Sequence, residues 1–230
     1  MSEDIASAAA RTKIFARIHA ALDVDPEDPS GHAVVADRLR RHPSGTVPAS
    51  ARLYGEQAIG QFSTSIAKQG ADVSRAATPK QVMGAIGSYL GAHNLPPRLR
   101  MGTDKVLAAL PWREAWDIER AFGPAEPADK TSLSRAIVGA AETGTLFLVS
   151  GKDNPTTLAF LPETHMVLIA ASDIFGSYEE AWRRLREDYG DGALPRSVNL
   201  ISGPSRTADI EQTIVRGAHG PRRLHVLILG

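Results

Sequence analysis

Two amphipathic helices separated by helix-breaking residues are predicted at the start of the chain. Within residues 5–22 the apolar side chains fall mostly on one side of a helix, and a shorter helix follows between proline and glycine clusters at 25–31 and 42–45. We therefore divide the chain into an N-terminal helical arm, residues 1–45, and a main domain, residues 46–230. Such an arm commonly packs on its own domain; docking on a partner is the alternative.

Two further helices are predicted before residue 95. Residues 50–69 repeat apolar side chains at helical spacing. Thr78 and Pro79 combine an N-cap residue with proline at the first helical position, and the helix that they open ends near Gly91. Short apolar segments fit strands around residue 73, at 99–101 and at 116–118.

The second half of the chain alternates β-prone apolar runs with helix signals. The runs are residues 145–150, 165–171, 198–201 and 224–229. Asn154 precedes a proline that opens a short helix, Ser177 begins a capping box for a helix ending at Gly190, and residues 208–215 have helical character. We predict an α/β fold with an open, mostly parallel sheet covered by helices.

Composition excludes several classes of function. The 26 basic and 26 acidic residues cancel, so nothing favours bulk attraction to nucleic acid or anionic lipid. The chain has no cysteine, which excludes disulfides, thiolate nucleophiles and cysteine-ligated iron–sulfur clusters held by this chain alone. No apolar run approaches the roughly 20 residues that span a bilayer, and the first residues contain no signal-like apolar region. We expect a cytoplasmic, soluble protein without membrane insertion.

A candidate anion site follows the run at 198–201. A Gly-Pro pair ends the strand, because proline cannot continue a central ladder, and a helix is predicted to follow. A strand, a tight turn and a helix start place free backbone N–H groups where an anion can bind. The ligand-binding candidates are Gly203, Pro204, Ser205, Arg206 and Thr207. The alternative is a plain connector in which Ser205 or Thr207 caps the helix.

A second candidate site is the turn that precedes the run at 145–150. Glu142 on this turn can serve as a nucleophile or general base, and Thr143 and Gly144 are ligand-contact candidates beside it. The alternative is a turn acid whose carboxylate accepts hydrogen bonds from nearby backbone amides.

Three of the seven histidines lie in or near the predicted sheet. His165 and His219 fall near predicted sheet edges, and His219 is a further ligand candidate, whereas His225 lies inside an apolar strand as a hydrogen-bonded core residue. No histidine pair has the His-x-x-x-His spacing of a zinc site, so we expect no metal. The glycine motifs of dinucleotide and ATP sites are also absent from the sequence.

Four ordered segments within residues 131–230 share their sequence with a known family. They read Ala-Glu-Thr-Gly-Thr at 141–145 with Ser-Gly at 150–151, Leu-Pro-Glu-Thr-His at 161–165, Asn-Leu-Ile-Ser-Gly-Pro-Ser-Arg-Thr-Ala-Asp-Ile-Glu at 199–211 and Gly-Ala-His-Gly-Pro-Arg-Arg-Leu-His at 217–225. Together these segments resemble the LUD domain family, the lactate-utilization proteins, and specifically its C type.

The resemblance implies both a fold and a function. The implied fold is the one shared by sugar-phosphate isomerases and CoA-transferases. The implied function is that of a subunit in the oxidation of L-lactate to pyruvate, next to iron–sulfur-associated partner subunits. We expect the chain to bind a small anionic metabolite or partner subunits and to carry no redox cofactor itself. The alternative is a stand-alone CoA-transferase-like or sugar-phosphate-isomerase-like enzyme that uses Glu142.

Both candidate sites adjoin predicted strand ends. Ligands of open α/β sheets bind in crevices at the carboxyl ends of the strands. We therefore predict that residues 203–207 and Glu142 converge there in one pocket for a small anion, which His219 closes.

Overall fold

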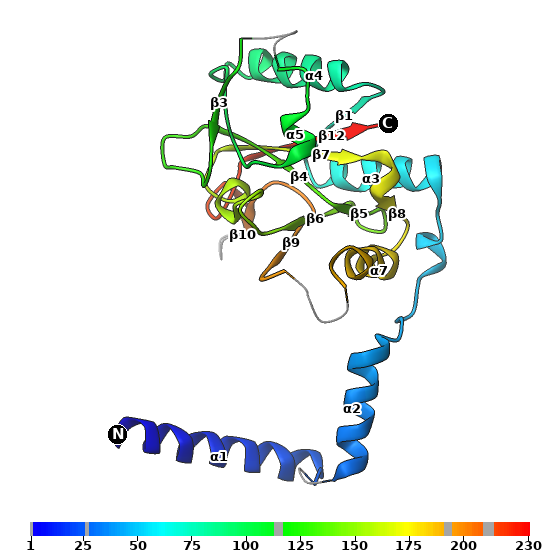
Figure 1. Ribbon diagram of the computed structural model, residues 1–230, viewed down its shortest axis with the longest axis vertical. Coiled ribbons are helices and arrows are strands. Elements are labelled where there is room, and N and C mark those ends of the chain that lie inside the picture. Colours follow the sequence, from blue (N-terminus) through cyan, green and yellow to red (C-terminus); the bar gives the residue numbers. More distant parts are fainter. Residues whose placement is uncertain (1, 26–27, 113–116, 191–194, 209–213) are drawn as a thin grey trace. The chain divides into compact units, whose positions relative to one another are not determined.

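The computed structural model describes most of the chain (Figure 1). The described residues are 2–25, 28–112, 117–190, 195–208 and 214–230, with side chains outside 2–6 and 207–216. They form two compact units, Met1–Gly45 and Thr46–Gly230.

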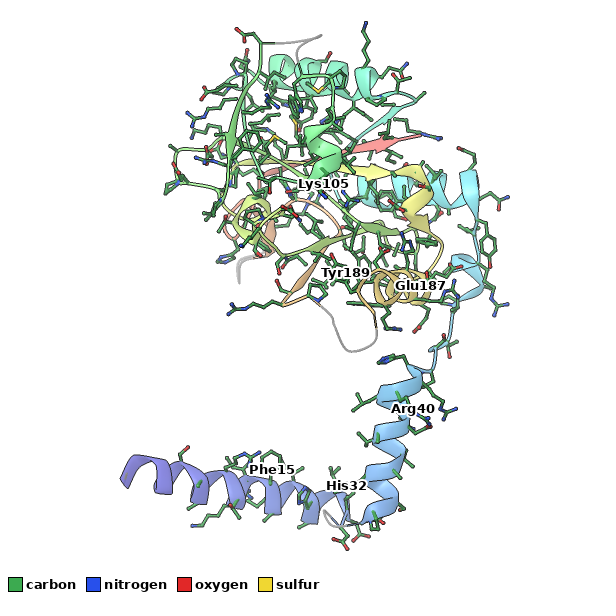
Figure 2. The ribbon with its side chains drawn as sticks, in the orientation of Figure 1. Phe15, His32, Arg40, Lys105, Glu187 and Tyr189 are labelled. Atoms are coloured by element: carbon green, nitrogen blue, oxygen red, sulfur yellow. The ribbon has the colours of Figure 1, made fainter. Side chains whose placement is uncertain are left out.

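The first unit consists of two helices, α1 (Ser2–Leu22) and α2 (Pro29–Arg41). Asp28 begins α2, because its side chain accepts a hydrogen bond from the Ser30 amide at 2.9 Å. Large apolar side chains on both helices are exposed, as Figure 2 shows for Phe15. Across the described residues, no helix combines the length and the apolar character needed to cross a membrane.

A six-stranded parallel sheet forms the centre of the second unit, in the order β1-β12-β7-β4-β2-β3. Its strands are β1 (Asp72–Ala76), β12 (Arg223–Leu229), β7 (Thr164–Ala170), β4 (Thr131–Arg135), β2 (Arg98–Met101) and β3 (Glu119–Phe122). The predicted α/β class with a parallel sheet is confirmed. The strand expected at 116–118 lies later in the chain, as β3; residue 116 is outside the described residues.

Helices flank the parallel sheet on both faces (Figure 1). They are α3 (Gly55–Lys68), α4 (Pro79–Ala92) and the short α5 (Lys105–Ala108). Side chains alternate between the faces along β7: Met166 and Leu168 pack with α4 and α5, while Val167 and Ile169 pack with α3. The predicted start of α4 is confirmed, because the Thr78 hydroxyl accepts a hydrogen bond from the amide of the third helical residue.

A second sheet of four strands packs on the α3 side, in the order β8-β5-β6-β9. Its strands are β5 (Val138–Ala140), β6 (Thr145–Val149), β8 (Ile174–Phe175) and β9 (Val198–Ile201). Two strands that we expected in the parallel sheet, at 145–150 and 198–201, are therefore β6 and β9 of a mainly antiparallel one. The physical reason is the short turn at 141–144, since so few residues can join only antiparallel neighbours.

Helix α7 (Tyr178–Tyr189) covers the outer face of this second sheet. Its predicted capping box is confirmed: the Ser177 hydroxyl accepts from the Glu180 amide, and the Glu180 carboxylate accepts from the Ser177 amide. Phe147 of β6 packs edge-on against Trp182 of α7, with ring centroids 5.1 Å apart. The described part of the unit also contains three short 3₁₀ helices: η1 (Ala49–Ala51), η2 (Thr156–Ala159) and η3 (Ala171–Asp173).

The helix predicted at 208–215 is wrong in the part that can be described. Arg206–Ala208 is strand β10, and it pairs in antiparallel fashion with β11 (Ile214–Arg216). The β-branched residues of these segments favour the extended backbone, and pairing between the two strands satisfies their amides. Residues 209–213, which include Asp209 and Glu211, lie outside the described residues.

Candidate functional site

A cavity of about 260 Å³ lies where the chain leaves β9 and where it enters β7 and β12. We call it the β9 cavity. Its wall is formed by Ala159, Phe160, His165, residues 200–206, residues 219–221 and Leu224. It therefore brings together three segments that are far apart in sequence.

The predicted ligand candidates divide into two groups. Gly203, Pro204, Ser205, Arg206 and His219 line the β9 cavity. Thr207 lies in β10 with its backbone paired to residue 215, and its side chain is outside the described part. Residues 142–144 are not among those that line the cavity.

Backbone hydrogen bonds hold the two loops of the cavity together. The Ser205 amide donates to the Pro221 carbonyl at 2.8 Å, and the Gly217 amide donates to the Ser205 carbonyl at 3.1 Å. The loop after β9 and the loop before β12 are thus fastened at Ser205. This pairing explains why Ser205 and His219, fourteen positions apart, border the same cavity.

The Arg206 guanidinium lies over the chain just after α3. A side-chain carbon added at Gly70 would collide with Nη2 of Arg206, so the arginine depends on this glycine for its position. Arg206 itself is exposed. The carbonyl end of a helix attracts a cation, which favours this placement. The five N–H donors of a guanidinium suit a carboxylate or phosphate at the mouth of the cavity.

His165 forms the buried part of the cavity wall. It is fully buried on β7, and its Nε2 is 2.9 Å from the Ser134 hydroxyl of the neighbouring strand β4. Burial lowers the pKa of His165 to about 3, so the ring is neutral at physiological pH. Its Nδ1 is also buried and has no hydrogen-bond partner among the described residues.

Glu142 occupies the turn between β5 and β6, next to α7. Its carboxylate accepts a hydrogen bond from the Tyr178 amide at 3.3 Å, at the first residue of the helix. A negative charge at a helix N-terminus is stabilising. This is the contact expected of a turn acid, and a catalytic role for Glu142 stays a prediction.

A chain of hydroxyl groups connects this turn with the β9 cavity. The Tyr178 hydroxyl lies 2.8 Å from that of Thr143 and 2.6 Å from that of Thr145. The Thr145 hydroxyl in turn lies 2.6 Å from that of Ser202, which lines the cavity. The two predicted regions are therefore neighbours, joined through Thr145 and Ser202.

The β9 cavity lies at the opposite sheet edge from the one we predicted. His165 and Leu224 are the second residues of β7 and β12, so the cavity borders the amino ends of these parallel strands. The predicted loop does follow the carboxyl end of β9, but β9 belongs to the second sheet. The helix expected to supply amides to an anion is replaced by β10 in the described segment.

The carboxyl edge of the parallel sheet carries a different polar group of residues. Arg135, at the end of β4, donates to the Asp104 carboxylate at 2.9 Å. Asp104 directly precedes Lys105, the first residue of α5, which Figure 2 labels. Asp173 follows β7, and burial raises the pKa of its carboxyl group. Over the described residues, no cluster of histidine and acidic side chains suits a metal ion.

Two polar residues of the cavity wall, Ser202 and His165, were not among the site candidates predicted from the sequence. Ser202 sits at the end of the run at 198–201 and looks like part of an ordinary turn. His165 opens an apolar run, which locates it near a strand end but does not reveal that one ring nitrogen is unpaired.

The fold and the cavity define an α/β domain with a central parallel sheet, a second sheet on one face and a cavity with both polar and apolar lining residues at the amino edge. Within this class, the chain belongs to the LUD domain family, whose family model matches residues 59–229. The resemblance drawn from the four sequence segments is confirmed.

Individual relatives agree with this assignment. An uncharacterized protein of Neisseria meningitidis is 42% identical over 97 residues, which cover 42% of this chain and 41% of that protein. The lactate utilization protein C of Shouchella clausii is 34% identical over 113 residues, 49% of each chain, and that of Bacillus subtilis is 31% identical over 109 residues, 46% of this chain and 45% of that protein. The chain spans about half the length of these relatives.

A solved structure supports the fold. A DUF162 family protein from Deinococcus radiodurans superimposes with a TM-score of 0.59 over 77% of this chain and 99% of that one. Its sequence identity is 21%, so this likeness concerns the fold alone.

Proposed function

We propose that this chain is a subunit of an L-lactate utilization system, in which lactate is oxidised to pyruvate, and that it binds a small anionic metabolite in the β9 cavity. The family membership and the relatives named lactate utilization protein C support the process. The cavity supports the binding role, because one arginine and two serines are among the residues that line a space suited to a small acid.

The observation that carries the binding role is the chemistry of the cavity wall. Arg206 offers paired N–H donors, and Ser202 and Ser205 offer hydroxyl groups. A volume of about 260 Å³ is below the roughly 300–1,000 Å³ of pockets for drug-sized ligands. Carboxylates of a few carbon atoms fit this description.

Calorimetric titration of the full chain with L-lactate, pyruvate and phosphate tests the proposal. Arg206→Lys keeps the positive charge but loses the planar fork, so it should weaken carboxylate binding by roughly 1 kcal/mol or more. Arg183→Lys is the matched control, because Arg183 is exposed on α7 and does not line the cavity. Equal loss in both variants, or unchanged binding in Arg206→Lys, would remove Arg206 from the site.

The redox cofactors of such a system would reside on partner subunits. A chain without cysteine cannot hold an iron–sulfur cluster through thiolates, so we propose iron–sulfur-associated partners for the electron-transfer step. The chain purified alone under anaerobic conditions should contain no stoichiometric iron or flavin and should not reduce a dye with lactate. Iron, flavin and lactate-dependent dye reduction should instead appear with the proteins that co-purify from the native cell.

The alternative function is an enzyme that uses Glu142 on an acyl or sugar-phosphate substrate. This alternative is supported by the chain of hydroxyl groups from Thr143 to Ser202, which joins the Glu142 turn to the β9 cavity. Covalent trapping of an acyl group on Glu142, detected by mass spectrometry of the quenched protein, would establish this alternative.

A further inference from the structure

Four hydroxyl groups form one hydrogen-bonded cluster between the Glu142 turn and the β9 cavity. The Thr143 oxygen lies 2.6 Å from that of Thr145 and 2.8 Å from that of Tyr178, and the latter two are 2.6 Å apart, so the three close a ring. The Ser202 hydroxyl joins this ring through Thr145 alone, at 2.6 Å. The antiparallel pairing of β6 with β9 accounts for that contact, because it brings the start of one strand beside the end of the other.

The number of protons in this cluster determines the direction of one hydrogen bond. Hydroxyl oxygens come this close when a proton lies between them, so the four contacts require four protons. Each hydroxyl group has a single proton to donate. All four protons are therefore used inside the cluster, and Ser202, which has one contact there, must donate to Thr145. The bonds of the ring can run in either sense, but the direction of this bond is the same in both.

Ser202 therefore offers lone pairs but no proton to the β9 cavity. It belongs to the wall of the cavity and is partly exposed, whereas Thr145 is fully buried. Among the described residues, the Ser202 hydroxyl has no other hydrogen-bond partner. Two oxygens that both lack a proton repel each other at hydrogen-bond distance. A ligand oxygen beside Ser202 must consequently bring a proton of its own.

We infer that Ser202 selects the ligand of the β9 cavity by acting only as a hydrogen-bond acceptor, and that Tyr178 keeps it in this state. The ligand class is an anion that carries an O–H group, such as hydrogen phosphate, and the class it rejects is a fully deprotonated oxyanion, such as sulfate. Tyr178 does not line the cavity, so it is a positioning residue. This inference rests on the proposed function, because it presupposes that a small anion occupies the cavity.

The proton count changes when the Tyr178 hydroxyl is removed. Tyr178→Phe leaves three hydroxyl groups and two contacts, so one proton becomes free. When Thr143 donates to Thr145 and Thr145 donates to Ser202, the free proton is that of Ser202, and it can bond to a ligand oxygen. A substitution outside the cavity should thus give Ser202 the ability to donate. A purely structural role of Tyr178 would not produce this gain.

Calorimetric titrations at about pH 8 compare hydrogen phosphate with sulfate, because both are dianions of the same shape and only phosphate carries an O–H group that a matching site can select. The wild-type chain should bind hydrogen phosphate about tenfold or more tightly than sulfate. Ser202→Ala should reduce this preference by weakening the binding of phosphate. Tyr178→Phe should reduce it in a different way, by strengthening the binding of sulfate.

Tyr189→Phe is the matched control. It removes a hydroxyl from the same helix, α7, and that hydroxyl has no hydrogen bond in the described chain and does not line the cavity. The control should keep the full preference for phosphate. Circular dichroism shows whether each variant is folded; if Tyr178→Phe is not, Ser202→Ala decides by the same comparison.

The outcomes separate this inference from the proposed function. Equal binding of the two anions by the wild-type chain, or a preference that survives in Ser202→Ala or in folded Tyr178→Phe, would overturn this inference alone. Binding of neither anion would overturn it as well. The proposed function would fall with it only if L-lactate and pyruvate also failed to bind.

Discussion

The two buried histidines are expected to make the folded chain sensitive to mild acid. Burial lowers the pKa of His165 to about 3 and that of His225 to about 4, from an ordinary value of 6.5. For His225, the Asp72 carboxylate opposes the shift and His93 adds to it. Because both folded-state values lie below the unfolded-state value, the associated stability is fully present above pH 6.5 and is lost as the pH falls towards the folded-state values.

The expected loss is large compared with the stability of an ordinary domain. Each histidine that protonates only in the unfolded state lowers the free energy of unfolding by about 1.4 kcal/mol per pH unit well below 6.5. Both together should lower it by roughly 3–4 kcal/mol between pH 7 and pH 5, against a typical total of about 5–15 kcal/mol. Asp173, whose pKa is raised by burial, acts in the opposite direction and moderates the loss at the acid end.

Urea unfolding followed by circular dichroism at about pH 7, 6 and 5 measures this effect. In the wild-type chain, the free energy of unfolding should decrease as the pH is lowered from 7 to 5. In His225→Leu, its change per pH unit should be about half as large, whatever stability this variant loses at pH 7. A wild-type stability that is flat or rises from pH 7 to pH 5 would refute the reasoning, because it would mean that the buried rings protonate in the folded state.

Three further predictions concern the Glu142 turn, the glycine beside it and the second unit. Glu142→Gln keeps an acceptor for the Tyr178 amide, so it should lower the free energy of unfolding by less than about 1 kcal/mol. Lactate-dependent growth should be normal if Glu142 only caps α7. Impaired growth with the variant at normal abundance would give the carboxylate a functional role. Gly144→Ala should lower the free energy of unfolding, measured by heat or urea, by about 2 kcal/mol or more, because φ is +69° and the added carbon would collide with the backbone of α3. Gly60→Ala, within α3 and with open space around it, should instead raise the free energy of unfolding by about 0.5–1 kcal/mol. Equal effects of the two substitutions would contradict the packing. A chain reduced to residues 46–230 should keep a cooperative thermal transition, since the described hydrophobic cores lie in that unit, and a loss of cooperativity would show that residues 1–45 are required.

Elements with strong local signals could be predicted from the sequence. The start of α4 at Thr78 and the capping box of α7 at Ser177 depend on side chains within three residues of the helix start, and both were confirmed. The buried runs at β7 and β12 were confirmed for the same reason, because their composition alone favours strands. At these positions, local signals were enough to identify the elements.

Sheet membership could not be predicted, because it depends on pairing between distant segments. The run that became β6 is as apolar as β7, yet it pairs with β5 and β9 in the second sheet. The helix expected at 208–215 failed for a related reason: its helical character is a local property, whereas β10 is defined by its pairing with β11. As a consequence, the predicted location of the pocket was wrong, because the loop after β9 does not lie at the carboxyl edge of the parallel sheet.

The glycines of both candidate motifs share a structural cause at the end of α3. A side-chain carbon at Gly144 would meet the backbone of Ile66, and one at Gly203 would lie 2.8 Å from the side chain of Gln69. Gly70, the next residue, makes room for Arg206 in the same way. The Glu142 turn and the loop after β9 are therefore neighbours because each crosses the last turn of one helix at a distance that only glycine permits. A larger side chain at Gly144 or Gly203 would move the loop to which it belongs, and one at Gly70 would displace the Arg206 guanidinium from its place beside the end of α3.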